Sequence, residues 1–169
     1  MGCIQRLDGG GVRIIDGYNV IGAAGEFGLA LSLPDKEIRL LRLLSNFRSR
    51  CRSRQPMLVV FDGHYGKLAD GPRRYSHLGI QVEWSLGETA DAVIVRKVRA
   101  AARGREIEVV TADEQILRAV ASCGAKGIRS REFLAELSRV FVEAPAAEKP
   151  EAPSPAEVAE WLDLFRDGR

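Results

Sequence analysis

The sequence predicts an α/β fold with one parallel sheet, and two features of the 169-residue chain support this prediction. Short apolar runs typical of buried strands alternate with longer stretches of helical spacing, an order that indicates βαβ units with right-handed crossovers. Acidic residues stand at or just beyond the ends of these runs, as in Ile14-Ile15-Asp16 and Val59-Val60-Phe61-Asp62. We expect one globular domain over residues 1–142.

The first half of the chain provides two of the expected strands. The first spans Val12 to Asp16, and the glycine-rich segment from Gly22 to Leu33 predicts a loop after it. Pro34 fits the first turn of a helix from Asp35 to Arg54, which carries apolar residues on one side and arginines on the other. The continuous apolar run from Met57 to Phe61 predicts a central strand that is buried on both faces.

The second half continues the alternation after a surface loop at residues 63–79, where glycines are frequent and no period is visible. A short strand from Lys126 to Arg129 leads to Ser130, which we expect to cap a helix that runs to Val142. The intervening elements are a strand from Ile80 to Trp84, a helix from Glu88 to Arg103 ended at Gly104, a strand from Ile107 to Thr111 and a helix from Asp113 to Ser122.

The last 27 residues differ in composition from the rest of the chain. Residues 143–155 are rich in proline, alanine and glutamate and indicate a linker. Residues 156–169 predict an amphipathic C-terminal helix with Val158, Trp161, Leu162 and Phe165 on one side. That side needs an apolar surface, which either the same domain or a partner would provide.

Composition excludes several classes of protein. No apolar run approaches the length of a membrane span and the first residues lack the apolar core of a signal peptide, so we expect a cytoplasmic protein that does not contact membranes. The three cysteines are far apart without a CxxC pair, which indicates reduced thiols and no zinc site. The net charge is only +2, but six arginines lie between residues 39 and 54. They form either a solvated helix face or a local positive field for nucleic acid.

The acids that follow the strands predict a metal site. Carboxyl ends of parallel strands meet at one sheet edge, which places Asp16, Asp62 and Asp113 together. Glu88 and Asp91 are three residues apart in the first turn of a predicted helix and share a face, although the helix dipole alone favours acids there. Gathered carboxylates repel one another unless a cation binds them, and oxygen ligands suit Mg²⁺ or Mn²⁺.

Such a metal site is compatible with a nuclease, a phosphatase or a signalling receiver. A phosphatase of the haloacid-dehalogenase type needs a second aspartate two residues after Asp16, where Tyr18 stands. A receiver needs paired acids after the first strand and a downstream lysine, which are also absent. These departures favour hydrolysis by water that a metal activates.

Several segments carry a family resemblance. Ile15-Asp16-Gly17-Tyr18-Asn19-Val20-Ile21, Val60-Phe61-Asp62-Gly63, Gly87-Glu88-Thr89-Ala90-Asp91, Thr111-Ala112-Asp113-Glu114-Gln115, Gly124-Ala125 and Ile128-Arg129-Ser130-Arg131-Glu132-Phe133 together resemble the YacP-type NYN-domain proteins. The resemblance spans residues 12 to 142 in unbroken order, and the DGYN and GETAD elements are specific in combination.

The resemblance implies a PIN-like, FLAP-nuclease-related three-layer α/β/α sandwich with a central, mainly parallel sheet. It also implies a Mg²⁺ or Mn²⁺ cluster, endoribonuclease activity on messenger RNA and association with ribosomes. By the same resemblance the metal ligands are Asp16, Asp62, Asp91 and Asp113, with Glu88 beside them as a ligand or base, while Asn19 positions water or a phosphate.

Residues near these motifs suggest how RNA is held. His64, Lys67, Arg73 and Arg74 are candidates to contact the RNA backbone, and Tyr65 or Tyr75 to stack on a base, unless all belong to an exposed loop. Ser85 and Thr111 are candidates to orient carboxylates. The sequence thus predicts a metal-dependent endoribonuclease for single-stranded or ribosome-presented RNA. The alternatives are an RNA- or ribosome-binding module that does not cut, and a phosphatase for small esters.

Overall fold

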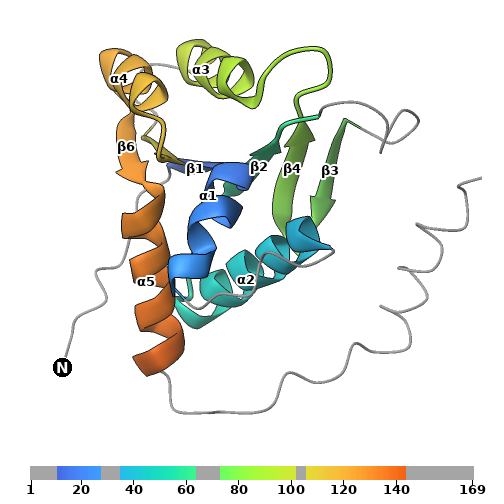
Figure 1. Ribbon diagram of the computed structural model, residues 1–169, viewed down its shortest axis with the longest axis vertical. Helices are drawn as coiled ribbons and strands as arrows, with labels where there is room; N and C mark the ends of the chain where they lie inside the picture. The colour runs from blue at the N-terminus through green and yellow to red at the C-terminus, as the bar shows by residue number, and fades with distance from the viewer. Residues whose placement is uncertain (1–10, 28–34, 64–72, 102–105, 144–169) are drawn as a thin grey trace, which may run out of the picture.

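The computed structural model describes residues 11–27, 35–63, 73–101 and 106–143, which form a six-stranded sheet between two layers of helices (Figure 1). The strand order is β3-β4-β2-β1-β5-β6, and every neighbouring pair is parallel except β3 and β4. The predicted α/β/α sandwich with a mainly parallel sheet is therefore confirmed. The strands are β1 (Val12–Asp16), β2 (Met57–Phe61), β3 (Arg74–His77), β4 (Ile80–Trp84), β5 (Ile107–Thr111) and β6 (Lys126–Arg129).

The helices divide into two layers because successive strand residues point to opposite faces of the sheet. Ile15 faces a core built with α1, α2 and α5, whereas Ile14 faces a second core built with α3 and α4. All of these core side chains are almost fully buried. The helices are α1 (Gly17–Ala24), α2 (Lys36–Arg50), α3 (Ala90–Ala100), α4 (Glu114–Ser122) and α5 (Ser130–Glu143), with a 3-10 turn, η1, at Gly25–Phe27.

The first departure from prediction is α1, which occupies part of the predicted loop. A Cβ atom at Gly17 would come within 2.3 Å of a ring carbon of Phe61, so α1 lies against β2 only because this residue is glycine. The loop prediction was wrong over Gly22 to Phe27, where Gly22 lies within α1 and Gly25 takes right-handed helical dihedral angles, φ −59° and ψ −34°. Residues 28–34, with Pro34, lie outside the described part of the chain.

The second departure is the end of α2 at Arg50, four residues before the predicted end. Arg52 donates its N–H to the Ser49 carbonyl at 3.2 Å, and Ser53 donates to the Arg48 carbonyl at 3.0 Å. These bonds form a Schellman motif, in which the left-handed position is usually glycine. Here Arg52 takes that position with φ 49°, so no glycine marks the end of the helix in the sequence.

The third departure is β3, which lies within the predicted 63–79 loop. It pairs with β4 through a turn at Leu78 and Gly79, both with positive φ, 52° and 75°. Two-residue hairpin turns of this kind usually carry Asn-Gly or Asp-Gly, so Leu78 concealed the hairpin. Residues 64–72 are not described.

The predicted end of the third helix at Arg103 was also wrong, because α3 ends at Ala100 and Ala101 takes an extended conformation. Gly104, most of the 143–155 linker and the whole 156–169 helix fall outside the described residues. Glu143, the first residue of that linker, belongs to α5. Within the described ranges, no helix is both long and apolar enough to cross a membrane.

Candidate active site at the carboxyl edge of the sheet

The four predicted aspartates lie at the carboxyl edge of the sheet. Asp16 ends β1 and caps α1, Asp62 follows β2, and Asp113 follows β5 and caps α4. Asp91 lies in the first turn of α3. Since α1 and α4 leave neighbouring strands toward opposite faces of the sheet, the edge between β1 and β5 is a topological switch point, where α/β proteins bind ligands.

Asp16 is the most buried of these acids, at 8% exposure. Its Oδ1 accepts the Asn19 N–H at 3.4 Å, and its Oδ2 accepts the Thr111 hydroxyl at 3.1 Å. Burial raises the pKa of Asp16 to about 6; the two hydrogen bonds oppose this shift, while the charges of Asp91 and Asp62 add to it. An ionised Asp16 is therefore destabilised at neutral pH unless a cation binds nearby.

Asp91 shares this electrostatic environment. Partial burial raises the pKa of Asp91, and the charges of Asp113 and Asp62 raise it further. Within the described part of the chain, Asp16, Asp91 and Asp113 form no ion pair with arginine or lysine. The negative charge of these three carboxylates is thus not compensated by basic side chains of the described residues.

Thr111 connects two of the acids. It is fully buried, donates to Asp16 and accepts the Asp113 N–H at 3.2 Å. Asp113 in turn caps α4 by accepting the N–H groups of Gln115 and Ile116 at 2.7 and 3.3 Å. The expectation that Thr111 orients a carboxylate is confirmed.

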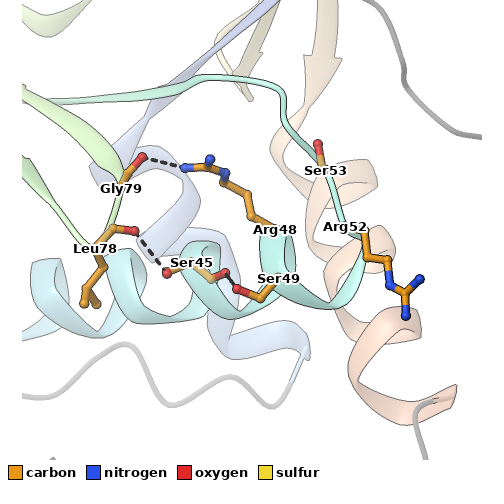
Figure 2. Close-up of a pocket in the computed structure, with 7 residues that line it drawn as sticks. All are labelled: Ser45, Arg48, Ser49, Arg52, Ser53, Leu78 and Gly79. Carbon is orange, nitrogen blue, oxygen red and sulfur yellow. Dashed lines mark hydrogen bonds between the residues drawn. The ribbon is translucent and has the colours of Figure 1, made fainter.

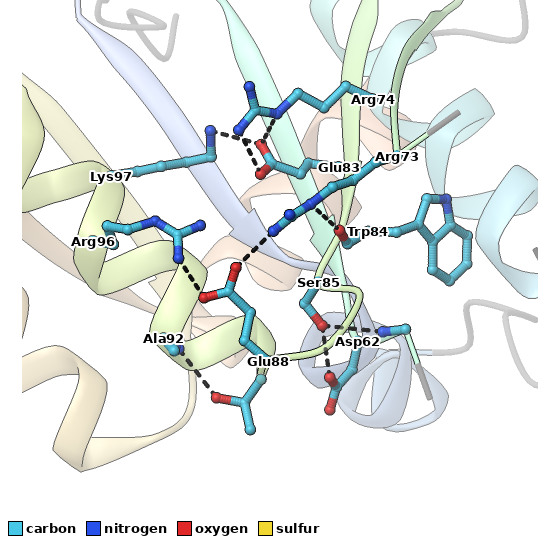
Figure 3. A network of polar contacts seen from close by, with 12 residues as sticks. Asp62, Arg73, Arg74, Glu83, Trp84, Ser85, Glu88, Ala92, Arg96 and Lys97 are labelled. Carbon is cyan, nitrogen blue, oxygen red and sulfur yellow. Dashed lines mark hydrogen bonds and ion pairs between the residues drawn. The ribbon is translucent and has the colours of Figure 1, made fainter. Parts of the chain in front are cut away.

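Ser85 plays the same part for Asp62. Its hydroxyl donates to Asp62 Oδ1 at 2.8 Å and accepts the Gly63 N–H at 3.1 Å (Figure 3). Because Ser85 is fully buried at the end of β4, this pair of bonds fixes the loop that carries Asp62. The expectation for Ser85 is also confirmed.

Asn19 has a structural contact that the sequence did not predict. Its Oδ1 accepts the Ala112 N–H and the Ser130 hydroxyl, both at 2.7 Å. Asn19 thereby ties α1 to the loop before Asp113 and to the start of α5. Ser130 was predicted only as a helix cap, and no local pattern indicates a contact between residues 111 positions apart.

Glu88 is directed away from the aspartates. One carboxylate oxygen lies 2.6 Å from Arg73 and the other pairs with Arg96, so the pKa of Glu88 is lowered by Arg96 first and Arg73 second (Figure 3). The prediction that Glu88 shares a helical face with Asp91 was wrong. Thr89 caps α3 by accepting the Ala92 N–H at 3.2 Å, so the helix begins at Ala90.

Glu83 is a buried acid that the sequence analysis did not select. Its carboxylate lies 3.0 Å from Arg74 Nε and 2.6 Å from Lys97 Nζ, and its side chain is 1% exposed. Burial alone would raise the pKa of Glu83, but the bonds from Lys97 and Arg74 outweigh burial and lower it. The sequence carried little signal for this burial, because Gln81, two residues earlier in β4, is exposed and alternation places both side chains on the same face.

The predicted RNA contacts are only partly described. Arg73 and Arg74 are engaged with Glu88 and Glu83, and Tyr75 is half-buried against the core. His64, Tyr65 and Lys67 lie outside the described residues.

The aspartates fit a divalent cation by chemistry but do not form a closed cage. Among the described residues, no three acidic, histidine or cysteine side chains converge closely enough to hold a metal ion as they stand. Mg²⁺ commonly keeps several water ligands and uses one or two carboxylates, so a complete protein cage is not required. The hard oxygen ligands and the raised pKa of Asp16 are what such an ion would complement.

Comparison with known proteins places this chain in a family. The family model described as the YacP-like NYN domain matches residues 13–160. The crystal structure of Rae1 (YacP) from Bacillus subtilis matches with a TM-score of 0.59. The two sequences are 27% identical, and the match covers 91% of each chain. Its W164L mutant is 24% identical, with a TM-score of 0.60 and coverage of 79% of this chain and 78% of the mutant, which supports the fold. A search of curated proteins found no match. The chain therefore belongs to the YacP-like NYN-domain family, which has a nuclease-like α/β fold.

Proposed function

We propose that this protein is a metal-dependent endoribonuclease that cleaves single-stranded or ribosome-associated messenger RNA at the carboxyl edge of the sheet. The observation that carries the proposal is the uncompensated charge around Asp16, whose pKa is raised to about 6 by burial and by Asp91 and Asp62. The nuclease-like family supports RNA as the substrate. A cytoplasmic location and association with the ribosome belong to the same proposal.

Each residue at the edge has a distinct task in this proposal. Asp16, Asp62, Asp91 and Asp113 hold Mg²⁺ or Mn²⁺, which when bound acidifies a water molecule and neutralises charge on the phosphate. Thr111 fixes Asp16 relative to Asp113, and Ser85 fixes Asp62.

Asn19 supports the site without belonging to the set of carboxylates. Its Oδ1 holds the loop before Asp113, and its amide nitrogen donates no hydrogen bond within the described residues. That nitrogen is therefore available to a phosphate or water oxygen. Glu88 would join the ligands only by leaving Arg73 and Arg96.

The direct test is cleavage of an end-labelled single-stranded RNA. We expect internal cleavage with Mn²⁺ or Mg²⁺, and loss of cleavage with EDTA or after Asp16→Asn. Cleavage that persists equally in both controls would come from a contaminant and would refute the proposal.

A second candidate is an RNA- or ribosome-binding module that does not cut. It is favoured by one observation, that no three metal-ligating side chains converge among the described residues. It predicts salt-dependent RNA binding that EDTA does not change, with no turnover at any metal concentration. A phosphatase would instead hydrolyse a chromogenic phosphate ester and leave RNA intact.

A further inference from the structure

A polar pocket lies at the edge of the sheet opposite the aspartates, between the C-terminal half of α2 and the β3–β4 turn (Figure 2). It has a volume of about 330 Å³ and is lined by three serines and two arginines of α2 and its end, together with Leu78 and Gly79. Gly79 precedes the first residue of β4, whereas Asp16, Asp62 and Asp113 lie at or beyond the last residues of β1, β2 and β5. The five residues of β4 span roughly 16 Å, so the pocket is separate from the candidate active site.

The pocket carries positive charge that no acid neutralises. No carboxylate lines it, and within the described residues neither Arg48 nor Arg52 forms an ion pair. The arginines beside the active site differ, because Arg73, Arg74 and Arg96 each pair with a glutamate. Arg48 reaches toward Gly79, whereas the Arg52 guanidinium at the other end of the pocket is directed away from Arg48 (Figure 2). The charge of Arg48 is therefore available to an anion, and Arg52 adds to the local positive field.

The hydrogen-bond donors of the pocket are only partly used. Arg48 Nη1 donates to the Gly79 carbonyl at 2.5 Å, while its Nε is buried without a partner. A guanidinium has five N–H bonds, so most of the donors of Arg48 have no acceptor among the residues that the structure describes. Ser53 Oγ accepts the Gln55 N–H at 3.2 Å, which leaves its hydroxyl hydrogen free to donate.

The backbone around the pocket is held in costly conformations. Among the described residues three non-glycine residues have positive φ, and two of them, Arg52 and Leu78, line the pocket. Such conformations concentrate at functional sites, where surrounding contacts maintain them. Here Ser45 donates its hydroxyl to the Leu78 carbonyl at 3.1 Å and so fastens the turn to α2.

We propose that this pocket binds a phosphate group of an RNA backbone, so that RNA is held at a distance from the aspartates as well as beside them. The planar arginine fork matches phosphate oxygens, and the Ser53 hydroxyl can donate to one of them. The hydroxyls of Ser45 and Ser49 already donate to the Leu78 and Ser45 carbonyls, both at 3.1 Å. No aromatic ring lines the pocket in the described part of the chain, so it would contact the backbone and not stack on a base. The choice of RNA as the ligand rests on the proposed function.

The test is binding of a fluorescent single-stranded RNA in EDTA at several salt concentrations, where cleavage does not interfere. Arg48→Gln/Arg52→Gln should weaken binding about tenfold, as expected for lost charge-assisted hydrogen bonds. It should also reduce the slope of log K against log salt by about 0.7, the value for one phosphate contact on a single strand. The matched control is Arg39→Gln/Arg99→Gln, which removes the same charge from exposed positions outside the pocket. Equal weakening by both double variants would overturn the proposal.

Arg52→Gly separates binding from folding. Glycine suits the left-handed position of the Schellman motif, so this variant should unfold at the same temperature as the wild type or higher. We expect its RNA affinity to fall several-fold nonetheless, because one of the two guanidinium groups is gone. Wild-type affinity in this variant would contradict the proposal.

Two comparisons distinguish failure of the pocket from failure of the proposed activity. If RNA binds through Arg48 and Arg52 but is never cut with Mn²⁺ or Mg²⁺, the activity fails and the pocket assignment stands. If RNA is cut but the pocket variants bind like the wild type, the assignment fails alone. A third outcome combines two measurements: inorganic phosphate raises the unfolding temperature of the wild type but not of Arg48→Gln/Arg52→Gln, and the two proteins bind RNA equally well. The pocket would then be a phosphate site that RNA does not use, which would also overturn the proposal.

Discussion

Two sets of acids stand near the carboxyl edge of the sheet, and their partners differ. Asp16 and Asp113 accept hydrogen bonds from neutral donors, the Thr111 hydroxyl and backbone N–H groups. Glu83 and Glu88 each contact two basic side chains. Neutral donors orient a carboxylate without cancelling its charge, whereas the basic partners neutralise the glutamates within the protein. Of these four acids, only Asp16 and Asp113 therefore lack a basic partner among the described residues and retain charge for an external cation.

Removal of the Asp16 charge should have the largest effect on activity. We expect Asp16→Asn to lower cleavage at least about 100-fold, because a ligand of the metal is lost while the cap of α1 is kept. Initial rates on single-stranded RNA at saturating Mn²⁺ measure the effect. A variant that keeps a tenth of wild-type activity would show that Asp16 does not hold the metal.

The same substitution should stabilise the folded protein at neutral pH. The pKa of Asp16 rises from 3.8 to about 6 on folding, so the folded state binds the proton more tightly. Stability therefore falls as pH rises from about 4 to 6, and above 6 the cost reaches up to about 3 kcal/mol. Urea unfolding in EDTA should show Asp16→Asn to be more stable than the wild type at pH 8, with the difference lost near pH 4. A less stable variant at pH 8 would contradict the burial argument.

Thr111→Val should have the next largest effect on activity. It removes the hydroxyl between Asp16 and Asp113 without changing the shape of the side chain. Loss of such a supporting bond typically lowers metal affinity or activity 10- to 100-fold. The bond also lowers the pKa of Asp16, so its loss should move the acid limb of the rate–pH profile to higher pH. Thr111→Ser should restore both, and a Thr111→Val enzyme with an unshifted profile would argue against this role.

Glu83→Gln should affect stability and leave cleavage nearly unchanged. The substitution leaves Lys97 and Arg74 without a charged partner beside a buried site, which we expect to cost about 1–3 kcal/mol. Because the folded pKa of Glu83 is lowered, its contribution is present above its ordinary value of 4.5 and disappears as pH falls below that value. Wild type and variant should therefore converge in urea unfolding at low pH. A cleavage defect as large as that of Asp16→Asn would place Glu83 among the functional acids.

Much of the fold was predictable because the spacing of apolar residues along the sequence indicates which side chains are buried. Five of the six strands and their parallel arrangement follow from apolar runs and helical spacing, whereas the α/β/α layers were implied by the family resemblance. The errors in the predicted elements involve three residues whose role is not visible in the local sequence. One packs against a residue far away in the chain, and two stand where glycine or asparagine is usual. Gly17 is required by Phe61, and Arg52 and Leu78 occupy left-handed positions that normally signal their presence with glycine or asparagine.

The site was predictable to the level of the sheet edge. Strand ends placed Asp16, Asp62 and Asp113 together, and the roles of Ser85 and Thr111 followed from their positions beside them. The ion pairs of Glu88 were not predictable, because Arg73 and Arg96 come from separate elements whose side-chain directions the sequence does not specify.

Glu88→Gln should have the smallest effect on cleavage, and it tests the comparison most directly. If Glu88 serves only Arg73 and Arg96, cleavage should stay within about threefold of wild type, since exposed ion pairs contribute little. RNA affinity in EDTA should rise slightly, because both arginines lose their carboxylate and become available to phosphate. Asp91→Asn is the matched control and should lower cleavage at least about 100-fold. If the cleavage rate of Glu88→Gln instead falls as far as that of this control, Glu88 must leave its arginines when the metal binds. The division between neutralised glutamates and charged aspartates would then apply only to the metal-free protein.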